Sequence, residues 1–225
     1  RLRPRRTPPA GPGDPPNVSF LVAAYNEAPV IADKVENTLA LNTGGADIEL
    51  IVVSDGSADE TAEIVRKVDD PRITVLEPGR VGKAQALAQG LKCCTGDIVV
   101  FSDANAILEK NSLTAMLRHY ADPEVGGVCG QITVEGKSGG IGFAESLFWR
   151  YDQQLKHAES RLGGAISAQG SVYSLRRALV RRNRNGTQAA PPCALSSIQC
   201  LSQFVFSVWK TSVGPPSHLS PHWPV

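Results

Sequence analysis

The sequence has few cysteines and no long apolar run, and both features exclude common classes of protein. Its five cysteines show no C-x-x-C spacing, which argues against a zinc site and against a disulfide framework. No run of 18 apolar residues occurs, so these residues contain no candidate transmembrane helix. The formal net charge is only +1, which favours neither a nucleic-acid partner nor an acidic one.

Acidic residues are absent from the last third of the chain. All 22 Asp and Glu residues lie at or before Glu159, whereas basic residues continue to Lys210. A soluble domain normally intersperses both signs of charge. We therefore divide the chain into a Pro/Arg-rich linker (1–17), a folded domain (18–177) and an atypical acid-free tail (178–225). The tail is expected to be disordered or to come from a shifted reading frame, with only 198–209 apolar enough to pack.

The linker admits two interpretations. It is rich in proline and carries four arginines within its first six residues. This composition fits a disordered spacer, and it also fits the cytoplasmic flank of a membrane helix outside this chain.

Within the folded domain, apolar runs alternate with segments of helical periodicity. Strands are predicted at residues 18–23, 48–53, 73–76, 98–101 and 125–134, and helices at 29–41, from 61 onward, 83–94, 113–120 and 142–161. The S-x-x-E sequence at 57–60 predicts a capping box for the second helix. The alternation predicts an α/β fold with a mostly parallel sheet flanked by helices.

A polar segment follows each of the first four predicted strands. These segments are A-A-Y-N-E (23–27), S-D-G-S (54–57), P-G-R-V-G-K (78–83) and D-A-N (103–105). Because the carboxyl ends of parallel strands lie at one edge of a sheet, we expect the four segments to share a crevice.

The side chains expected in this crevice suit a nucleoside diphosphate and a divalent cation. Lys83 and the N–H groups of helix starts suit phosphate oxygens. Asp55 and Glu27 can accept hydrogen bonds from a base or a ribose. Asp103 is a hard oxygen ligand for a cation that would offset the charge of a departing diphosphate.

Each motif also has an ordinary structural explanation. Asp55 and Gly56 form a common turn sequence, Lys83 suits a solvated helix start, and Glu27 suits a helix N-terminus. Tyr25 is explained more simply by packing. What favours a shared site is that polar motifs follow four successive strands.

Together the motifs A-A-Y-N-E, V-V-S-D-G-S, G-R-V-G-K-A and F-S-D-A-N resemble the family 2 glycosyltransferases. The resemblance runs from about Val18 to Arg177 and includes D-P-E-V-G-G-V-C-G and G-A-I-S-A-Q-G-S-V-Y-S-L-R-R. It implies the GT-A fold, with a Rossmann-like sheet. It also implies metal-dependent, inverting transfer of a hexosyl or N-acetylhexosaminyl group from a nucleotide sugar, expected to be UDP-linked. Many relatives are membrane-anchored polysaccharide synthases, similar to those that make cellulose, chitin, hyaluronan or poly-N-acetylglucosamine.

The resemblance further implies roles for individual residues. They are Ala24, Tyr25, Glu27, Asp55, Lys83 and Asp103 for the donor, Asp103 and Asn105 for Mg²⁺ or Mn²⁺, and Glu145, Gln169 and Gly170 for the acceptor groove. The implied partners are a nucleotide-sugar donor and a saccharide or lipid-linked acceptor, with no nucleic acid. The implied location is cytoplasmic, at the cytoplasmic face of the membrane in full-length relatives, with membrane association only through segments missing from this chain.

Three departures from the family pattern affect these expectations. Ala23 stands where the family usually has proline, and Asn105 replaces the second acid of D-x-D, although its carbonyl can still bind a hard cation. The family's downstream catalytic Asp has no counterpart after Glu159, and the Q-x-x-R-W motif is absent. No catalytic residue is therefore identified, since His157 lies in a helix-like run that favours a surface role.

Two main hypotheses follow. The first is an active glycosyltransferase, whose domain is incomplete at its C-terminal end. The second is a truncated or inactive nucleotide-sugar-binding module that lacks the catalytic base. The order of the motifs disfavours a third, a GT-A-like nucleotidyltransferase.

Overall fold

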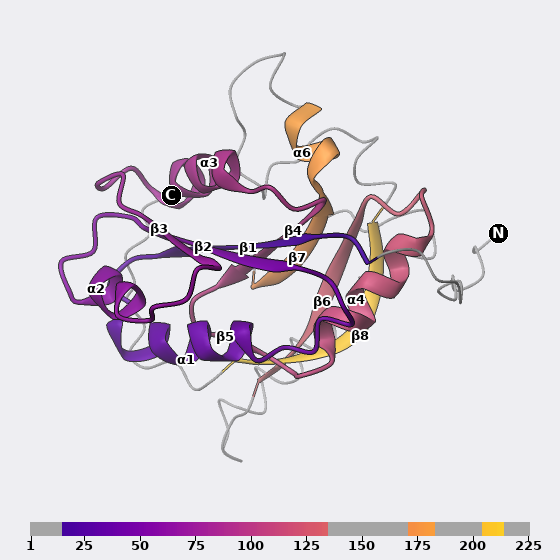
Figure 1. The fold of residues 1–225 in the computed structure, drawn as a ribbon, viewed down its shortest axis with the longest axis horizontal. Helices are drawn as coiled ribbons and strands as arrows, with labels where there is room; N and C mark the ends of the chain where they lie inside the picture. The colour runs from indigo at the N-terminus through magenta and orange to yellow at the C-terminus, as the bar shows by residue number, and fades with distance from the viewer. Residues whose placement is uncertain (1–14, 135–170, 183–203, 214–225) are drawn as a thin grey trace, which may run out of the picture.

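The computed structural model describes residues 15–134, 171–182 and 204–213 (Figure 1). In chain order the elements are β1 (Val18–Ala24), α1 (Ala28–Leu39), β2 (Ile48–Ser54), α2 (Thr61–Arg66), β3 (Ile73–Leu76), α3 (Lys83–Cys93), β4 (Ile98–Asp103), β5 (Ala106–Leu108), α4 (Ser112–Leu117), a 3₁₀ turn η1 (Arg118–Ala121), β6 (Gly127–Val134), β7 (Val172–Arg176), α6 (Arg177–Arg182) and β8 (Phe204–Val213).

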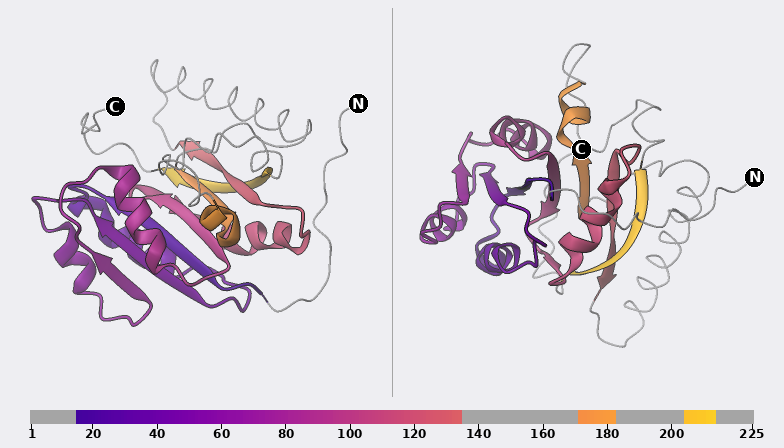
Figure 2. Two further views of the ribbon diagram at one scale, coloured as in Figure 1. Left: turned by 90° about the horizontal axis from the view of Figure 1, so that it is seen from above. Right: turned by 45° about the vertical axis from the view of Figure 1, so that its right-hand side comes forward.

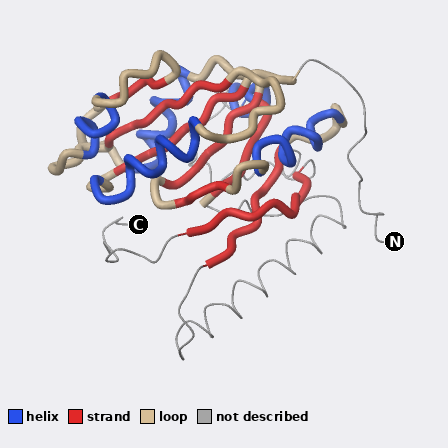
Figure 3. Tube along the Cα trace, turned by 60° about the horizontal axis from the view of Figure 1, so that its bottom comes forward, coloured by secondary structure: helices blue, strands red, loops and turns tan. Residues whose placement is uncertain are grey.

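The described strands form one eight-stranded sheet in the order β3-β2-β1-β4-β7-β6-β8-β5. Strand β1 pairs in parallel with β2 and β4, and β2 pairs in parallel with β3. Strand β7 runs antiparallel between β4 and β6. The strands lie side by side across the molecule, with helices outside them (Figure 3). The predicted α/β architecture, a mostly parallel sheet with flanking helices, is confirmed.

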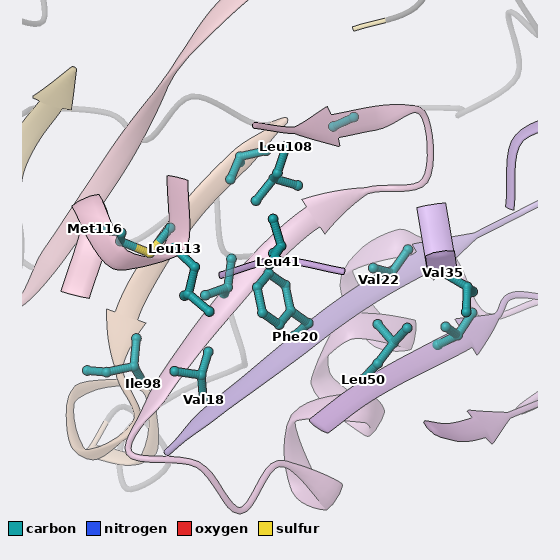
Figure 4. Close-up of a cluster of buried hydrophobic side chains, with 14 of the residues drawn as sticks. Val18, Phe20, Val22, Val35, Leu41, Leu50, Ile98, Leu108, Leu113 and Met116 are labelled. Atoms are coloured by element: carbon teal, nitrogen blue, oxygen red, sulfur yellow. The ribbon is translucent and has the colours of Figure 1, made fainter. Parts of the chain in front are cut away.

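Helices cover both faces of the parallel strands. Helix α3 lies on one face, and α1 and α2 lie on the other (Figures 1 and 2). Successive strand residues point to opposite faces, so each buried strand contributes to two cores. In β1, Phe20 and Val22 join the core under α1, whereas Leu21 and Ala23 join the core under α3. Figure 4 shows Phe20 and Val22 within the first of these cores.

Helix α3 approaches the sheet closely at Gly90. A Cβ at this position would lie 2.4 Å from Leu21 Cδ1 and 2.7 Å from Val53 Cγ2. Only a residue without a side chain allows this contact. This contact holds α3, the helix that begins at Lys83, against β1 and β2.

The structure differs from expectation at several local features. The capping box predicted at 57–60 is wrong: α2 begins after Glu60 with no side-chain cap, and Asp59 Oδ1 accepts the N–H of Thr61 instead. The reason is that Ser57 is already engaged by the neighbouring loop, where its Oγ accepts the N–H of Asn26. Strands β5 and β7 were not predicted, and the helix predicted at 142–161 lies outside the described residues.

Part of the acid-free tail forms a strand. Strand β8 lies within residues 178–225, expected to be disordered, and pairs in parallel with β6 and antiparallel with β5. Its sequence, FVFSVWKTSV, is rich in aromatic and β-branched residues, which favour strands. Among the described residues, no helix has both the length and the apolar character needed to cross a membrane.

Candidate active site at the carboxyl edge of the parallel strands

The register of the parallel strands brings the four polar segments to one edge. Ala23 of β1 lies opposite Val53 of β2 and opposite Asp103 of β4. Val53 in turn lies opposite Leu76, the last residue of β3. The four strands therefore end at the same level, and the expectation of a shared edge is confirmed.

Asn26 joins the loop after β1 to the loop after β2. Its backbone has a φ of 54°, in the left-handed region that Asn tolerates better than most residues. Its N–H donates to Ser57 Oγ (3.1 Å), and its Oδ1 accepts the N–H of Ala58 (2.8 Å). The next residue continues the link, since the N–H of Glu27 donates to Thr61 Oγ1 (2.9 Å). Sequence reasoning did not single out Asn26, and the left-handed conformation gives no signal in a single sequence.

Glu27 is half-buried at the start of α1, close to other acids. Burial raises the pKa of its carboxyl above the usual value, and the negative charges of Asp103 and Asp59 raise it further, while Lys83 lowers it. The carboxylates of Asp103 and Asp59 therefore lie close enough to Glu27 to repel its charge. A cation bound near Asp103 would relieve this repulsion.

Asp55 is fully buried and organises the loop before α3. Its Oδ1 accepts the N–H groups of Val81 (2.7 Å) and Gly82 (3.0 Å), and its Oδ2 accepts Arg80 Nη1 (2.9 Å). Its own N–H donates to the carbonyl of Ala24 (2.8 Å), which fixes Asp55 to the end of β1. Asp55 thus lies at the predicted edge, with its carboxylate shaping the loop that leads to the lysine.

The turn at Gly56 requires glycine. Its φ is 68°, and a Cβ there would lie 2.7 Å from the backbone nitrogen of Arg80. This contact holds the loops after β2 and β3 together. The guanidinium of Arg80 then lies over the ring of Tyr25, with its Cζ 3.4 Å from the ring centroid. Tyr25, Asp55 and Arg80 therefore form one connected group.

Lys83 and Asp103 meet at the centre of this edge. Lys83 is the first residue of α3, and Asp103 is the last residue of β4. Their Nζ and Oδ1 atoms are 2.6 Å apart, and both side chains are partly exposed. The structure therefore brings together the phosphate-type lysine and the metal-type acid of the sequence analysis.

The donor set suits a cation shared with a bound diphosphate. Asp103 offers a carboxylate, and Asn105, two residues later, is exposed to solvent and offers an amide oxygen. Among the described residues, no group of three or more His, Cys, Asp or Glu side chains gathers to hold a metal. Magnesium-type ions commonly use one or two protein oxygens and complete their shell with phosphate oxygens and water. The residues present fit that arrangement.

Lys34 is a buried basic residue beneath the Asp103 turn that sequence reasoning missed. It lies on α1 with no exposed surface, and its Nζ donates to Ser102 Oγ (2.7 Å) and to the carbonyl of Ala106 (2.6 Å). Burial lowers the pKa of its ammonium to about 7, and the negative charge of Asp103 opposes this shift. A lysine on an amphipathic helix is normally exposed, so the sequence offered no sign of this position.

The three residues assigned to the acceptor groove are not part of this description. Glu145, Gln169 and Gly170 all lie outside the described residues. Their assignment stays a prediction from the resemblance.

A family model and curated relatives match most of the chain. The model described as "Glycosyl transferase family 2" matches residues 19–184. The poly-β-1,6-N-acetyl-D-glucosamine synthase of Staphylococcus aureus (strain COL) is 32% identical over 162 residues, which cover 70% of this chain and 39% of that protein. The synthase of the same name from Staphylococcus epidermidis is 30% identical over the same length. The chain thus spans about two fifths of the length of these relatives.

Two solved structures share the fold. A mannosyltransferase from Pyrobaculum calidifontis, in complex with GDP-Man and Mn²⁺, superposes with a TM-score of 0.66 at 25% identity and covers 86% of this chain and 56% of its own. Glucosyl-3-phosphoglycerate synthase from Mycobacterium tuberculosis superposes with a TM-score of 0.59 at 20% identity. The superposition covers 88% of this chain and 70% of that structure's chain. The second likeness supports the fold alone.

Proposed function

The chain belongs to glycosyl transferase family 2, and from this premise we propose that it binds a UDP-linked sugar at the carboxyl edge of its parallel strands. The observation that carries the proposal is the Lys83–Asp103 pair, 2.6 Å apart beside the loop held by Asp55. A lysine at a helix start suits the negative charge of a diphosphate, and a carboxylate at a strand end suits the cation that the diphosphate binds. The Mn²⁺ complex of the Pyrobaculum calidifontis mannosyltransferase supports a divalent cation.

We assign the residues as follows. Tyr25, Asp55 and Glu27 would line the part of the site that takes the base and ribose. Lys83 would exchange its contact with Asp103 for one with the diphosphate. Asp103 and Asn105 would then hold Mg²⁺ or Mn²⁺.

The proposed reaction is sugar transfer with inversion. An oxygen of an acceptor hydroxyl, on a saccharide or a lipid-linked sugar, forms a bond to the anomeric carbon. The bond from that carbon to the diphosphate oxygen breaks, and its electron pair leaves with UDP. A bound divalent cation would offset the charge of the leaving group. The proton of the hydroxyl must pass to a base.

One observation favours a second candidate, a nucleotide-sugar-binding module without efficient transfer. Residues 160–225 contain no Asp or Glu, so they do not supply the downstream carboxylate that the resemblance implies. General-base catalysis contributes roughly 10²–10⁴-fold to rates of this kind. A chain without the base would bind the donor and turn over slowly.

A paired assay of turnover and binding tests the two candidates. The 225-residue chain is mixed with UDP-N-acetylglucosamine, chosen because of the names of the curated relatives, and with Mn²⁺ and chito-oligosaccharide acceptors. UDP release above that of an Asp103→Ala control supports the enzyme. Donor binding without release supports the binding module. A folded chain that neither binds the donor nor releases UDP contradicts both candidates. A parallel assay with GDP-mannose tests the choice of a uridine nucleotide.

A further inference from the structure

Lys34 connects helix α1 to both ends of the turn that carries Asp103 and Asn105. Its ammonium donates to Ser102 Oγ, directly before the turn, and to the carbonyl of Ala106, directly after it. The two acceptors are at 2.7 and 2.6 Å, so one group links them across the base of the turn. The chain between them is the D-A-N segment of the candidate cation site.

The surroundings of this contact are buried and hydrogen-bonded. Lys34 and Ala106 have no exposed surface, and Ser102 is only 5% exposed. One turn further along α1, the Asn37 side chain donates to the carbonyl of Leu108 and accepts its N–H, both at 2.8 Å. Helix α1 therefore fixes the turn at its two ends through Lys34 and fixes the following strand β5 through Asn37.

A buried lysine needs a reason at this position. Burying an ammonium group is costly even when it is hydrogen-bonded, whereas an apolar side chain of similar length would fill the same space without that cost. What the amine adds is a pair of hydrogen bonds with defined geometry, which are charge-assisted when it is protonated. These act on the segment whose two oxygen donors must be correctly spaced for a cation.

We propose that Lys34 is a positioning residue that holds the Asp103–Asn105 turn in the conformation that binds a divalent cation. The inference rests on the proposed function, because it presupposes a cation at Asp103. Lys34 does not touch the cation. It holds the Ser102 side chain before the ligands and the Ala106 carbonyl after them. Replacing such partners of metal ligands commonly changes metal affinity by about 10–100-fold.

The test measures Mn²⁺ binding directly in four versions of the chain. Free Mn²⁺ is quantified by electron paramagnetic resonance in the presence of UDP, for wild type, Lys34→Met, Thr38→Val and Asp103→Ala. Thr38→Val is the matched control, since Thr38 is buried on the same helix and its Oγ1 donates within α1, to the carbonyl of Lys34. Circular dichroism checks the fold, and UDP affinity without metal is measured separately.

The expected result is a split between metal and nucleotide affinity. Lys34→Met should weaken Mn²⁺ binding about tenfold, while metal-free UDP affinity stays within about twofold, because the hydrogen bonds removed act on the turn. Thr38→Val should bind Mn²⁺ as wild type does. If Lys34→Met does not fold, Ser102→Ala replaces it, and removal of one of the two bonds should weaken Mn²⁺ binding by about threefold.

The contradicting results are distinguishable. If Asp103→Ala loses Mn²⁺ and Lys34→Met, or Ser102→Ala in its place, matches wild type, the role of Lys34 is wrong and the proposed function stands. If Lys34→Met weakens UDP and Mn²⁺ equally, Lys34 supports the fold in general and not the turn. If the folded wild type binds no Mn²⁺ with UDP, the proposed function and the role of Lys34 fall together.

Discussion

Replacing Lys83 by methionine should change the affinities for metal and for nucleotide in opposite directions. In the nucleotide-free chain, Lys83 Nζ lies 2.6 Å from Asp103 Oδ1, so the lysine competes with any cation for that carboxylate. When UDP is bound, the same ammonium is expected to contact the diphosphate. Methionine keeps the length of the side chain and removes the charge.

The magnitudes follow from the exposure of the pair. The Lys83 and Asp103 side chains are 41% and 28% exposed, so their interaction falls within the range of solvent-screened ion pairs. Such pairs contribute about 0.2–1 kcal/mol, which predicts Mn²⁺ binding to the nucleotide-free variant about 1.4–5-fold tighter than to wild type. Loss of a charged hydrogen bond to phosphate costs about 1.5–3 kcal/mol, which predicts roughly 10–100-fold weaker UDP binding.

Calorimetric titrations with Mn²⁺ alone and with UDP plus Mn²⁺ measure both affinities. Lys92→Met is the matched control, because Lys92 is exposed at the other end of α3. This substitution removes the same charge from the same helix. It should leave both affinities near those of wild type. Weaker binding of both ligands by Lys83→Met, or no change in either, would refute the competition between lysine and cation.

Three further substitutions test the packing and hydrogen bonds of the fold. Asp55→Asn should lower the free energy of unfolding by about 2 kcal/mol in urea denaturation, because a buried amide cannot accept all the donors of the loop; wild-type stability would show that the loop re-forms. Gly90→Ala should destabilise the chain by about 1 kcal/mol, since overpacking against Leu21 exceeds the gain in helix propensity; a higher melting temperature would contradict this. Glu49→Gln should be less stable by about 1 kcal/mol at pH 7. Burial raises the pKa of Glu49, but hydrogen bonds from Ser19, Thr95 and Gly96 outweigh this effect and hold the pKa below 4.5. The stability difference should therefore persist above pH 4.5 and disappear as the pH falls through the lowered pKa. A stability difference that grows in acid would contradict this sign.

The sequence predicts the parallel half of the fold well because its strands are buried on both faces. Uninterrupted apolar runs such as Ile98–Phe101 are local signals, and the polar residue that ends each run marks the edge. The shared edge then follows from the topology of parallel strands. For this reason Asp55, Lys83 and Asp103 could be brought together before any coordinates were known.

Features that depend on distant partners could not be predicted. Strand β7 pairs antiparallel with β4 and β6, which are distant in the sequence, and β5 has only three residues and pairs with β8. Lys34 and Asn26 act through burial and a left-handed backbone, which depend on the packed fold. Strand β8 carries its own apolar signal, but the lack of acids around it favoured disorder.

The most direct test of the central claim is a calorimetric titration of the 225-residue chain with UDP, with and without Mn²⁺, in wild type and Asp103→Ala. The account predicts UDP binding that Mn²⁺ strengthens in wild type, with this increase lost in Asp103→Ala. A chain that is folded by circular dichroism and whose UDP affinity does not respond to Mn²⁺ would contradict it.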